Sequence, residues 1–201
     1  MKVNIYLLIC LISFYGFESQ AQEKDFPKWK SSIFFDINGS NKTQYTYYDR
    51  DNKIRETNLN GKGFIELSYE IDYRLLKSLS IAGTVGLTNF NYPTFASIKT
   101  GMGLKLLYVD SKYHHFALKY GYHLPFRRSD FREGHQIEFG QVFDVGAIFN
   151  GRLLIGFYVN YDFFYLDSST PVISDSDVVY RISRSADLKA SSYGLSLGIT
   201  F

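Results

Sequence analysis

Apolar and polar side chains alternate with a period of two along eight segments of this chain. That period places one kind of residue on each face of an extended strand, and no segment shows the period of an amphipathic helix. The pattern predicts strands at 29–38, 63–73, 79–88, 97–108, 114–124, 136–149, 152–166 and 191–201. We therefore expect an all-β protein.

The connections between these segments alternate between short and long. Residues 74–78 and 109–113 are short, and Asn150-Gly151 has the composition of a two-residue hairpin turn. Residues 39–62, 89–96, 125–135 and 167–190 are longer and more polar. Short turns at one end and long loops at the other are typical of an eight-stranded antiparallel up-and-down transmembrane β-barrel. An even number of strands also puts both ends of the barrel sequence on the short-turn side.

The two faces of the predicted strands differ in kind. One face carries bulky apolar residues and no charge, as in Ile33, Phe35 and Ile37 of the first segment. The other face carries most of the glycines together with charged residues. Glycine and serine are poor residues for a wetted strand surface but suit a narrow lumen. We therefore expect the apolar face to contact lipid and the polar face to fill the barrel.

The inward face should hold a network of paired charges, because an unpaired charge inside a narrow barrel is costly. Its predicted members are Asp36, Glu66, Glu70, Lys99, Lys105, Lys119, Glu138, Asp144 and Asp162. Such a network would plug the lumen. The alternative is a small-solute pore, which eight strands leave little room for.

The N-terminus has the pattern of a secretory signal. Lys2 precedes an apolar stretch from Val3 to Phe17, and Ser19-Gln20-Ala21 offers small residues before a cleavage point at Gln22. The predicted organisation is a signal peptide at 1–21, a short periplasmic segment at 22–28 and the barrel at 29–201. The chain's one cysteine, Cys10, falls within the signal, so we expect no disulfide or thiol chemistry in the mature protein.

Composition agrees with an exported β protein. Aromatic residues make up 18% of the 201 residues, and the formal net charge is only +2. The basic residues are scattered and matched by acids, which argues against nucleic acid as a partner. The sequence indicates no cofactor. His114-His115 lacks a carboxylate at a suitable spacing, so we expect no metal site.

The last ten residues, Ser192 to Phe201, resemble the closing strand of Gram-negative outer-membrane proteins. The matching positions are Tyr193, Leu195, Leu197, Ile199 and the terminal Phe201. The mature chain is similar in size and rhythm to small barrels of the OmpA/OmpX type. The resemblance implies an outer-membrane location, contact with outer-membrane lipid and lipopolysaccharide, and recognition of the last strand by the barrel-assembly machinery. We also expect a monomer.

Some barrels of this size are lipid A deacylases or palmitoyltransferases. Hydrolysis of this kind needs a histidine base, a serine nucleophile and an acid, and His123, Ser129 and Glu138 occur close together here. The deacylases carry a His-x-Ser pattern, however, whereas this chain has His123-Leu124-Pro125. The pair His135 and Glu138 is no better a catalytic candidate than His123, Ser129 and Glu138. We expect a non-enzymatic scaffold or loop-mediated binding protein, with a lipid A-modifying enzyme as the alternative.

One loop has candidate contacts for lipopolysaccharide. Arg127, Arg128 and Arg132 lie in the segment 125–135, and arginine side chains match the geometry of phosphate. Asp130 and Glu133 offset part of this charge, so a solvated loop is the alternative. The loops 39–62 and 167–190 could bind other partners, which their composition does not identify.

Overall fold

The computed structural model describes residues 28–48, 51–59, 63–91, 94–108, 113–127, 131–167, 172–173, 179–180 and 185–201. Its elements are β1 (Trp29–Tyr48), β2 (Ile54–Leu59), β3 (Phe64–Leu76), β4 (Leu79–Asn91), β5 (Thr94–Leu107), β6 (His115–Pro125), β7 (Glu133–Ile148), β8 (Gly151–Asp167), β9 (Val172–Ile173), β10 (Val179–Tyr180) and β11 (Ser185–Thr200). The described residues contain no helix that is long and apolar enough to cross a membrane.

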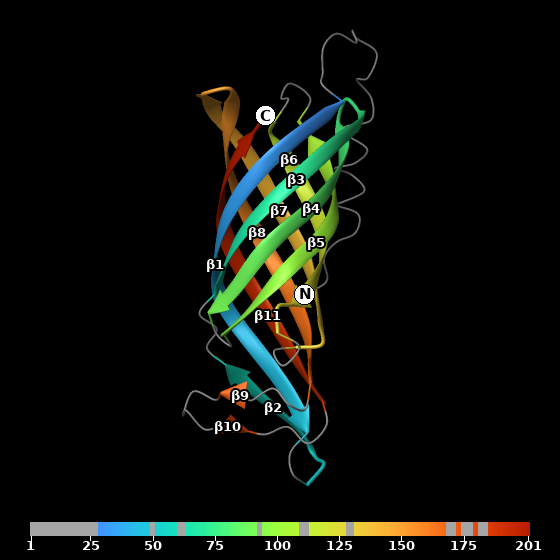
Figure 1. Ribbon diagram of the computed structural model, residues 1–201, viewed down its shortest axis with the longest axis vertical. Coiled ribbons are helices and arrows are strands. Elements are labelled where there is room, and N and C mark those ends of the chain that lie inside the picture. Colours follow the sequence, from blue (N-terminus) through green and yellow to red (C-terminus); the bar gives the residue numbers. More distant parts are fainter. Residues whose placement is uncertain are drawn as a thin grey trace.

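Eight of these strands form a closed barrel. Consecutive barrel strands pair antiparallel in the order β1, β3, β4, β5, β6, β7, β8 and β11, and β11 pairs back to β1 over Ser32–Tyr47. The strands are strongly tilted, as Figure 1 shows. The predicted eight-stranded antiparallel barrel is therefore confirmed.

The two ends of the barrel differ in length and in their connections. Tight turns at Lys77–Ser78 and Phe149–Asn150 lie at the end that also holds Trp29 and the C-terminus, which is the upper end in Figure 1. At the opposite end β1, β8 and β11 extend furthest, and β2 pairs with the last six residues of β1. We call this opposite end the long-loop end.

Four predicted connections need correction. Residues 39–62 and 167–190 were expected to be loops, but β1 continues to Tyr48, β2 follows it, and β11 begins at Ser185. The connection predicted at 89–96 is tight, because β4 ends at Asn91 and β5 begins at Thr94. The hairpin turn lies one residue earlier than Asn150-Gly151, and Phe149 takes the positive φ of 47°.

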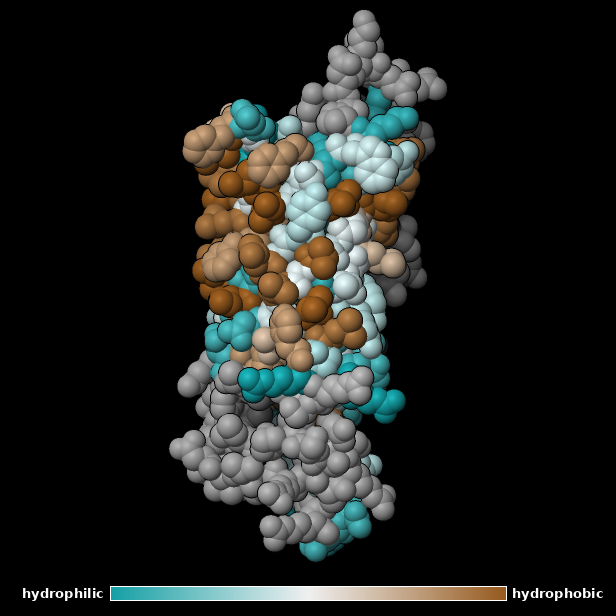
Figure 2. Space-filling view, in the orientation of Figure 1, coloured by the Kyte–Doolittle hydropathy of each residue, from teal (hydrophilic) through white to brown (hydrophobic). Residues whose placement is uncertain are grey.

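The outer wall of the barrel is apolar. Large outward side chains alternate with buried ones along every barrel strand, as in Ile65, Leu67, Tyr69 and Ile71 of β3. Figure 2 shows the resulting apolar belt, bounded towards the long-loop end by hydrophilic residues. An apolar belt around a charged interior is the arrangement of a membrane-spanning barrel, since exposing it to water would be costly.

Residues 1–27 lie outside the described part of the chain. The predicted signal peptide at 1–21 and all of segment 22–28 except Lys28 fall there, so these boundaries stay predictions.

Candidate functional site

A continuous chain of ion pairs crosses the middle of the lumen. Three lysines each bridge two carboxylates, so that charges alternate along the chain. In order, the groups are Glu66, Lys99, Glu138, Lys119, Glu70, Lys105 and Asp72. We call these seven residues the ion chain. Their side chains are at most 11% exposed, so each charge depends mainly on its protein partners rather than on water.

The geometry of the ion chain is set by the strands that carry it. Lys119 Nζ lies 3.1 Å from Glu70 Oε2 and 3.0 Å from Glu138 Oε1, and it therefore joins β3 to β7 across the lumen. Lys105 pairs with Glu70 and lies 2.8 Å from Asp72 Oδ1. Lys105 and Lys99 reach β3 across β4, whose inward residues next to them include the small Ala82 and Gly86.

Hydrogen bonds between charged groups and neutral side chains extend the network. Thr88 Oγ1 donates to Glu66 Oε2 at 3.1 Å. Lys99 Nζ donates to Gln136 Oε1 at 2.9 Å, and Gln136 Nε2 donates to Asp162 Oδ1 at the same distance. These bonds use the remaining capacity of the paired groups, which buried ion pairs need to offset the cost of leaving water.

The lumen holds more acids than bases at this level. Among the residues that the structure describes, Asp36, Glu66, Glu70, Asp72, Glu138 and Asp162 lie there with three lysines, Lys99, Lys105 and Lys119. Each lysine is accordingly shared by two carboxylates. Asp36 Oδ1 and Asp162 Oδ2 are buried oxygens without a hydrogen-bond partner among the described residues.

The short-turn end of the lumen is narrow. Arg152 Nη2 lies 2.6 Å from Asp144 Oδ2, and the Arg152 guanidinium and Lys30 Nζ both lie over the ring of Tyr113. The cavity at this end measures only about 20 Å³ and is lined by Lys105, Tyr113 and neighbouring residues. That volume is close to the space of a single water molecule.

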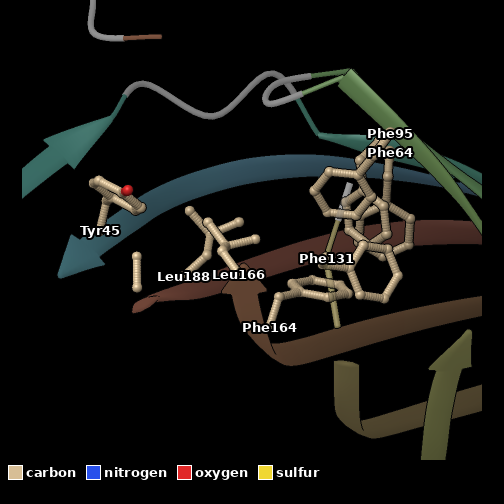
Figure 3. Packing of buried hydrophobic residues seen from close by; sticks show 9 residues of the cluster. Tyr45, Phe64, Phe95, Phe131, Phe164, Leu166 and Leu188 are labelled. Atoms are coloured by element: carbon tan, nitrogen blue, oxygen red, sulfur yellow. The ribbon is translucent and has the colours of Figure 1, made fainter. Parts of the chain in front are cut away.

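Aromatic side chains fill the lumen at the long-loop end. We call this cluster the aromatic cap; its buried members are Tyr45, Phe64, Phe90, Phe95, Phe131, Phe164, Leu166, Ala186 and Leu188. Phe164 contacts Phe90, Phe95 and Phe131 edge-on, with ring centroids 5.0, 5.0 and 5.1 Å away. Figure 3 shows the rings of Phe64, Phe95, Phe131 and Phe164 gathered together, with Leu166 and Leu188 between them and Tyr45.

Tyr45 lies in the part of β1 beyond the apolar belt. Its ring stacks on Tyr47 with centroids 5.1 Å apart, and its hydroxyl is buried without a hydrogen-bond partner among the residues described. Burial, with a smaller contribution from Tyr47, raises the pKa of the Tyr45 phenol well above its usual value. The phenol oxygen of Tyr45 is therefore shielded from water, like the apolar atoms of the cap.

Inward glycines make room for the rings. A Cβ on Gly134 would collide with the ring of Phe164, and one on Gly140 would collide with the ring of Tyr158. Both glycines lie on β7 directly opposite those aromatic residues on β8. The alternation predicts inward glycines, but it does not by itself predict the cap. Pairing of each glycine with an aromatic residue on the next strand is the signal that could have found it.

The candidate catalytic residues are not brought together. His123 is buried inside the barrel, where its Nδ1 lies 2.9 Å from Ser97 Oγ and its ring packs against Phe90 and Phe164. Glu138 belongs to the ion chain, and Ser129 lies outside the described residues. His135 faces outward and bonds Tyr120, so it lies on the opposite side of the wall from Glu138.

The histidines at 114 and 115 also have protein partners. His115 Nδ1 lies 2.6 Å from the backbone oxygen of Tyr113, and His114 Nε2 lies 3.2 Å from that of Asp144. Within the described ranges no group of three or more metal-binding side chains is present.

The remaining predicted site residues lie on the surface. Arg127 and Arg132 are exposed at the long-loop end, and Arg128 lies outside the described residues. Outward side chains of β11 include Tyr193, Leu195 and Leu197, while Ile199 is half-buried. Phe201 is exposed, and its backbone nitrogen donates to Ser31 O at 2.9 Å, which continues the β1–β11 seam to the last residue.

Comparison by sequence finds no matching family model and no matching curated protein. Comparison by structure finds distant similarities. A structure titled "Solid-state NMR structure of outer membrane protein AlkL in DMPC lipid bilayers" has a TM-score of 0.44 and 13% identity, covering 90% of this chain and 95% of that one. A Pseudomonas aeruginosa FadL homologue has a TM-score of 0.41 and 8% identity, covering 87% of this chain and 50% of that one.

A third similar structure comes from work titled "De novo design of transmembrane beta-barrels". It has a TM-score of 0.37 and 11% identity, covering 88% of this chain and 99% of that one. Similarity at this level assigns no activity to this chain.

Proposed function

We propose that this protein is a non-conducting, non-enzymatic barrel of a Gram-negative outer membrane that acts as a scaffold and presents its long loops for binding. The observation that carries the proposal is the filled lumen. The ion chain crosses its middle, and the aromatic cap fills the part of the lumen nearer the long-loop end. We infer that such packing provides mechanical stability and closes the lumen to solutes.

The outer wall supports the location. A belt of outward Leu, Ile, Val and Phe side chains surrounds the barrel, and the C-terminal aromatic residue ends its last strand. Strands of this kind satisfy every backbone group within lipid because the barrel has no open edge at the level of the belt. Heat-modifiable migration together with fractionation of the cell envelope tests this location. A chain recovered in the soluble periplasm would contradict it.

The surroundings of the histidines support the absence of catalysis. His123 is enclosed by Ser97, Phe90 and Phe164, which leaves it no access to a lipid on the outer wall. Incubation of the purified barrel with lipid A, followed by mass spectrometry, tests this part of the proposal. We expect an unchanged number of acyl chains, and a changed number would establish the enzymatic alternative.

Conductance in planar lipid bilayers tests the closed lumen. The wild-type barrel should give a flat baseline. A double variant that opens both layers, Phe131→Ala with Lys119→Ala, should show stepwise openings, because it removes one ring of the cap and the central link of the ion chain. An outward control, Phe139→Ala, should stay closed because its side chain faces lipid. Regular openings of the wild-type protein would overturn the proposal in favour of a pore.

A further inference from the structure

An apolar groove lies on the lipid-facing wall. It measures about 850 Å³ and is lined mainly by outward residues of six neighbouring strands, β1 and β3 to β7. One cross-strand row forms its floor: Ile71, Gly83, Met102, Tyr120 and Ile137. Gly83 is the low point of this row, since a Cβ there would meet no atom within 4 Å. The belt is thus hollowed at one place by the lack of a side chain.

The groove runs obliquely across the belt. It begins near the short-turn end at Trp29 and Tyr73, whose rings are 4.6 Å apart, and it ends at Tyr120 and Ile137. Ile137 is the fifth residue of β7 counted from the long-loop end, so the groove rises towards that end. Along the floor row from Ile71 to Ile137, four spacings of about 4.8 Å between neighbouring strands give a length of roughly 19 Å. The groove has the elongated shape of a single acyl chain.

Polar side chains lie at the end of the groove nearer the long-loop end. Tyr120, which lines the groove, has its hydroxyl 2.6 Å from His135 Nδ1. His135 belongs to the next cross-strand row, which continues through Phe163 to Lys189. Lys189 Nζ lies 5.6 Å from the centroid of the Phe163 ring. The exposed Arg132 lies three residues before His135, where its backbone nitrogen donates to Tyr165 O.

Carboxylates bound this polar end on its outer side. Glu133 and Asp187 occupy the row beyond His135 and Lys189, and Glu133 accepts a hydrogen bond from the Tyr122 hydroxyl at 3.4 Å. An anion is therefore favoured between the groove and the acidic row, next to His135 and Lys189, and disfavoured further out.

We propose that this surface binds lipid A, with one acyl chain in the groove over Gly83 and a phosphate held by His135, Lys189 and Arg132. Any bilayer fills the groove with some acyl chain, and the inference is that a phosphorylated lipid of the outer leaflet is preferred. The long-loop end carries the polar cluster, so the headgroup must come from the leaflet at that end. The assignment to lipid A rests on the proposed outer-membrane location.

Trp29, the chain's only tryptophan, lies in the groove and provides the readout. The purified barrel is placed in nanodiscs of brominated phosphatidylcholine, whose chains quench Trp29 fluorescence on contact. Lipid A without bromine is then added in small fractions. We expect Trp29 fluorescence to recover well beyond simple dilution, because lipid A displaces the brominated chain. Phosphatidylglycerol and dephosphorylated lipid A should give recovery by dilution only.

Two variants with matched controls connect the recovery to the groove and to the headgroup. Gly83→Leu fills the groove and should abolish the excess recovery, whereas Val85→Leu, outward on the same strand, should leave it unchanged. Arg132→Gln should raise the lipid A fraction needed for half recovery about tenfold, as expected for one lost charge-assisted bond. Arg55→Gln, exposed on β2, is its control.

The outcomes separate this inference from the proposed function. Recovery by dilution only, or equal recovery with phosphatidylglycerol or dephosphorylated lipid A, overturns the lipid A site and leaves the closed outer-membrane barrel intact. Equal recovery in Gly83→Leu and wild type also overturns it. Periplasmic fractionation or stepwise conductance, by contrast, counts against the proposed function.

Discussion

The apolar belt and the part of β1, β8 and β11 that continues beyond it at the long-loop end, which we call the extension, belong to the same strands but have opposite polarity. In the belt, β11 points Leu195 and Leu197 outward and Ser192 and Ser196 inward. In the extension, the same strand points Ala186 and Leu188 inward, and Lys189 lies on the outer row. The surroundings of the wall explain the reversal. Where the wall contacts lipid, apolar residues are stable on its outer face, and where it contacts water, apolar residues are stable on its inner face. The lumen accordingly changes from ion pairs to aromatic rings along its length.

The largest expected effect comes from the interior of the belt. Lys119→Met removes the group that bridges Glu70 and Glu138 and leaves excess negative charge buried. Breaking a buried pair on one side costs about 3–5 kcal/mol. Denaturant unfolding of the barrel in lipid vesicles measures this loss of unfolding free energy. A variant as stable as wild type would mean that water reaches the ion chain.

A second comparison tests the outer faces of the two regions. Leu195→Arg places a charge against lipid in the middle of the belt and should cost about 2–4 kcal/mol of unfolding free energy. Thr46→Arg lies on the outer face of the extension, opposite Asp187 and Glu56, and should change stability by less than about 0.5 kcal/mol. Equal costs at the two positions would show that both regions face the same surroundings.

The aromatic cap should respond to a change of shape. Phe164→Leu keeps most of the apolar volume but removes the edge contacts with Phe90, Phe95 and Phe131. Such contacts are worth about 0.5–1.5 kcal/mol each, and because the leucine side chain restores part of the packing, we expect a net loss of about 1–3 kcal/mol. The same substitution at the outward Phe157 on β8 should cost less than about 1 kcal/mol. The same vesicle unfolding assay compares the two, and a larger effect at Phe157 would contradict the packed cap.

The smallest effect is expected at the short-turn end. Arg152 pairs with Asp144 at 2.6 Å, but 37% of its side chain is exposed. Water screens such a pair, so Arg152→Met should cost only about 0–1 kcal/mol. Comparison with Lys119→Met in one unfolding series separates the screened pair from the buried ones. A loss at Arg152 as large as that at Lys119 would indicate that this end of the lumen is sealed as well.

The reversal of polarity also explains what the sequence could predict. The belt segments, such as 63–73 and 152–166, have a clear alternation because one face contacts lipid. The alternation weakens beyond Asn38, where β1 leaves the belt and the register shifts between Ser40 and Lys42. The sequence pattern therefore predicts loops where β1 continues to Tyr48 and where β11 begins at Ser185.

Part of the inner network can be predicted from the sequence. Period two assigned Glu70, Lys105, Lys119 and Glu138 to one face, and the structure places all four in the ion chain. Which lysine pairs with which carboxylate depends on strand register and on small residues of β4, which alternation does not specify. The groove depends on one missing side chain, at Gly83, and became visible only with the neighbouring strands in place.

The central claim is that the apolar face contacts acyl chains and the charged face fills the interior. Methyl NMR of the barrel in lipid nanodiscs tests this directly, through cross-relaxation between protein methyl groups and lipid chain protons. Ile65, Leu67 and Ile71 should show strong contacts with lipid chains, and the buried Ala82 and Ala117 should show none. Lipid contacts at the two alanines, with Ile65, Leu67 and Ile71 shielded from lipid, would contradict the claim.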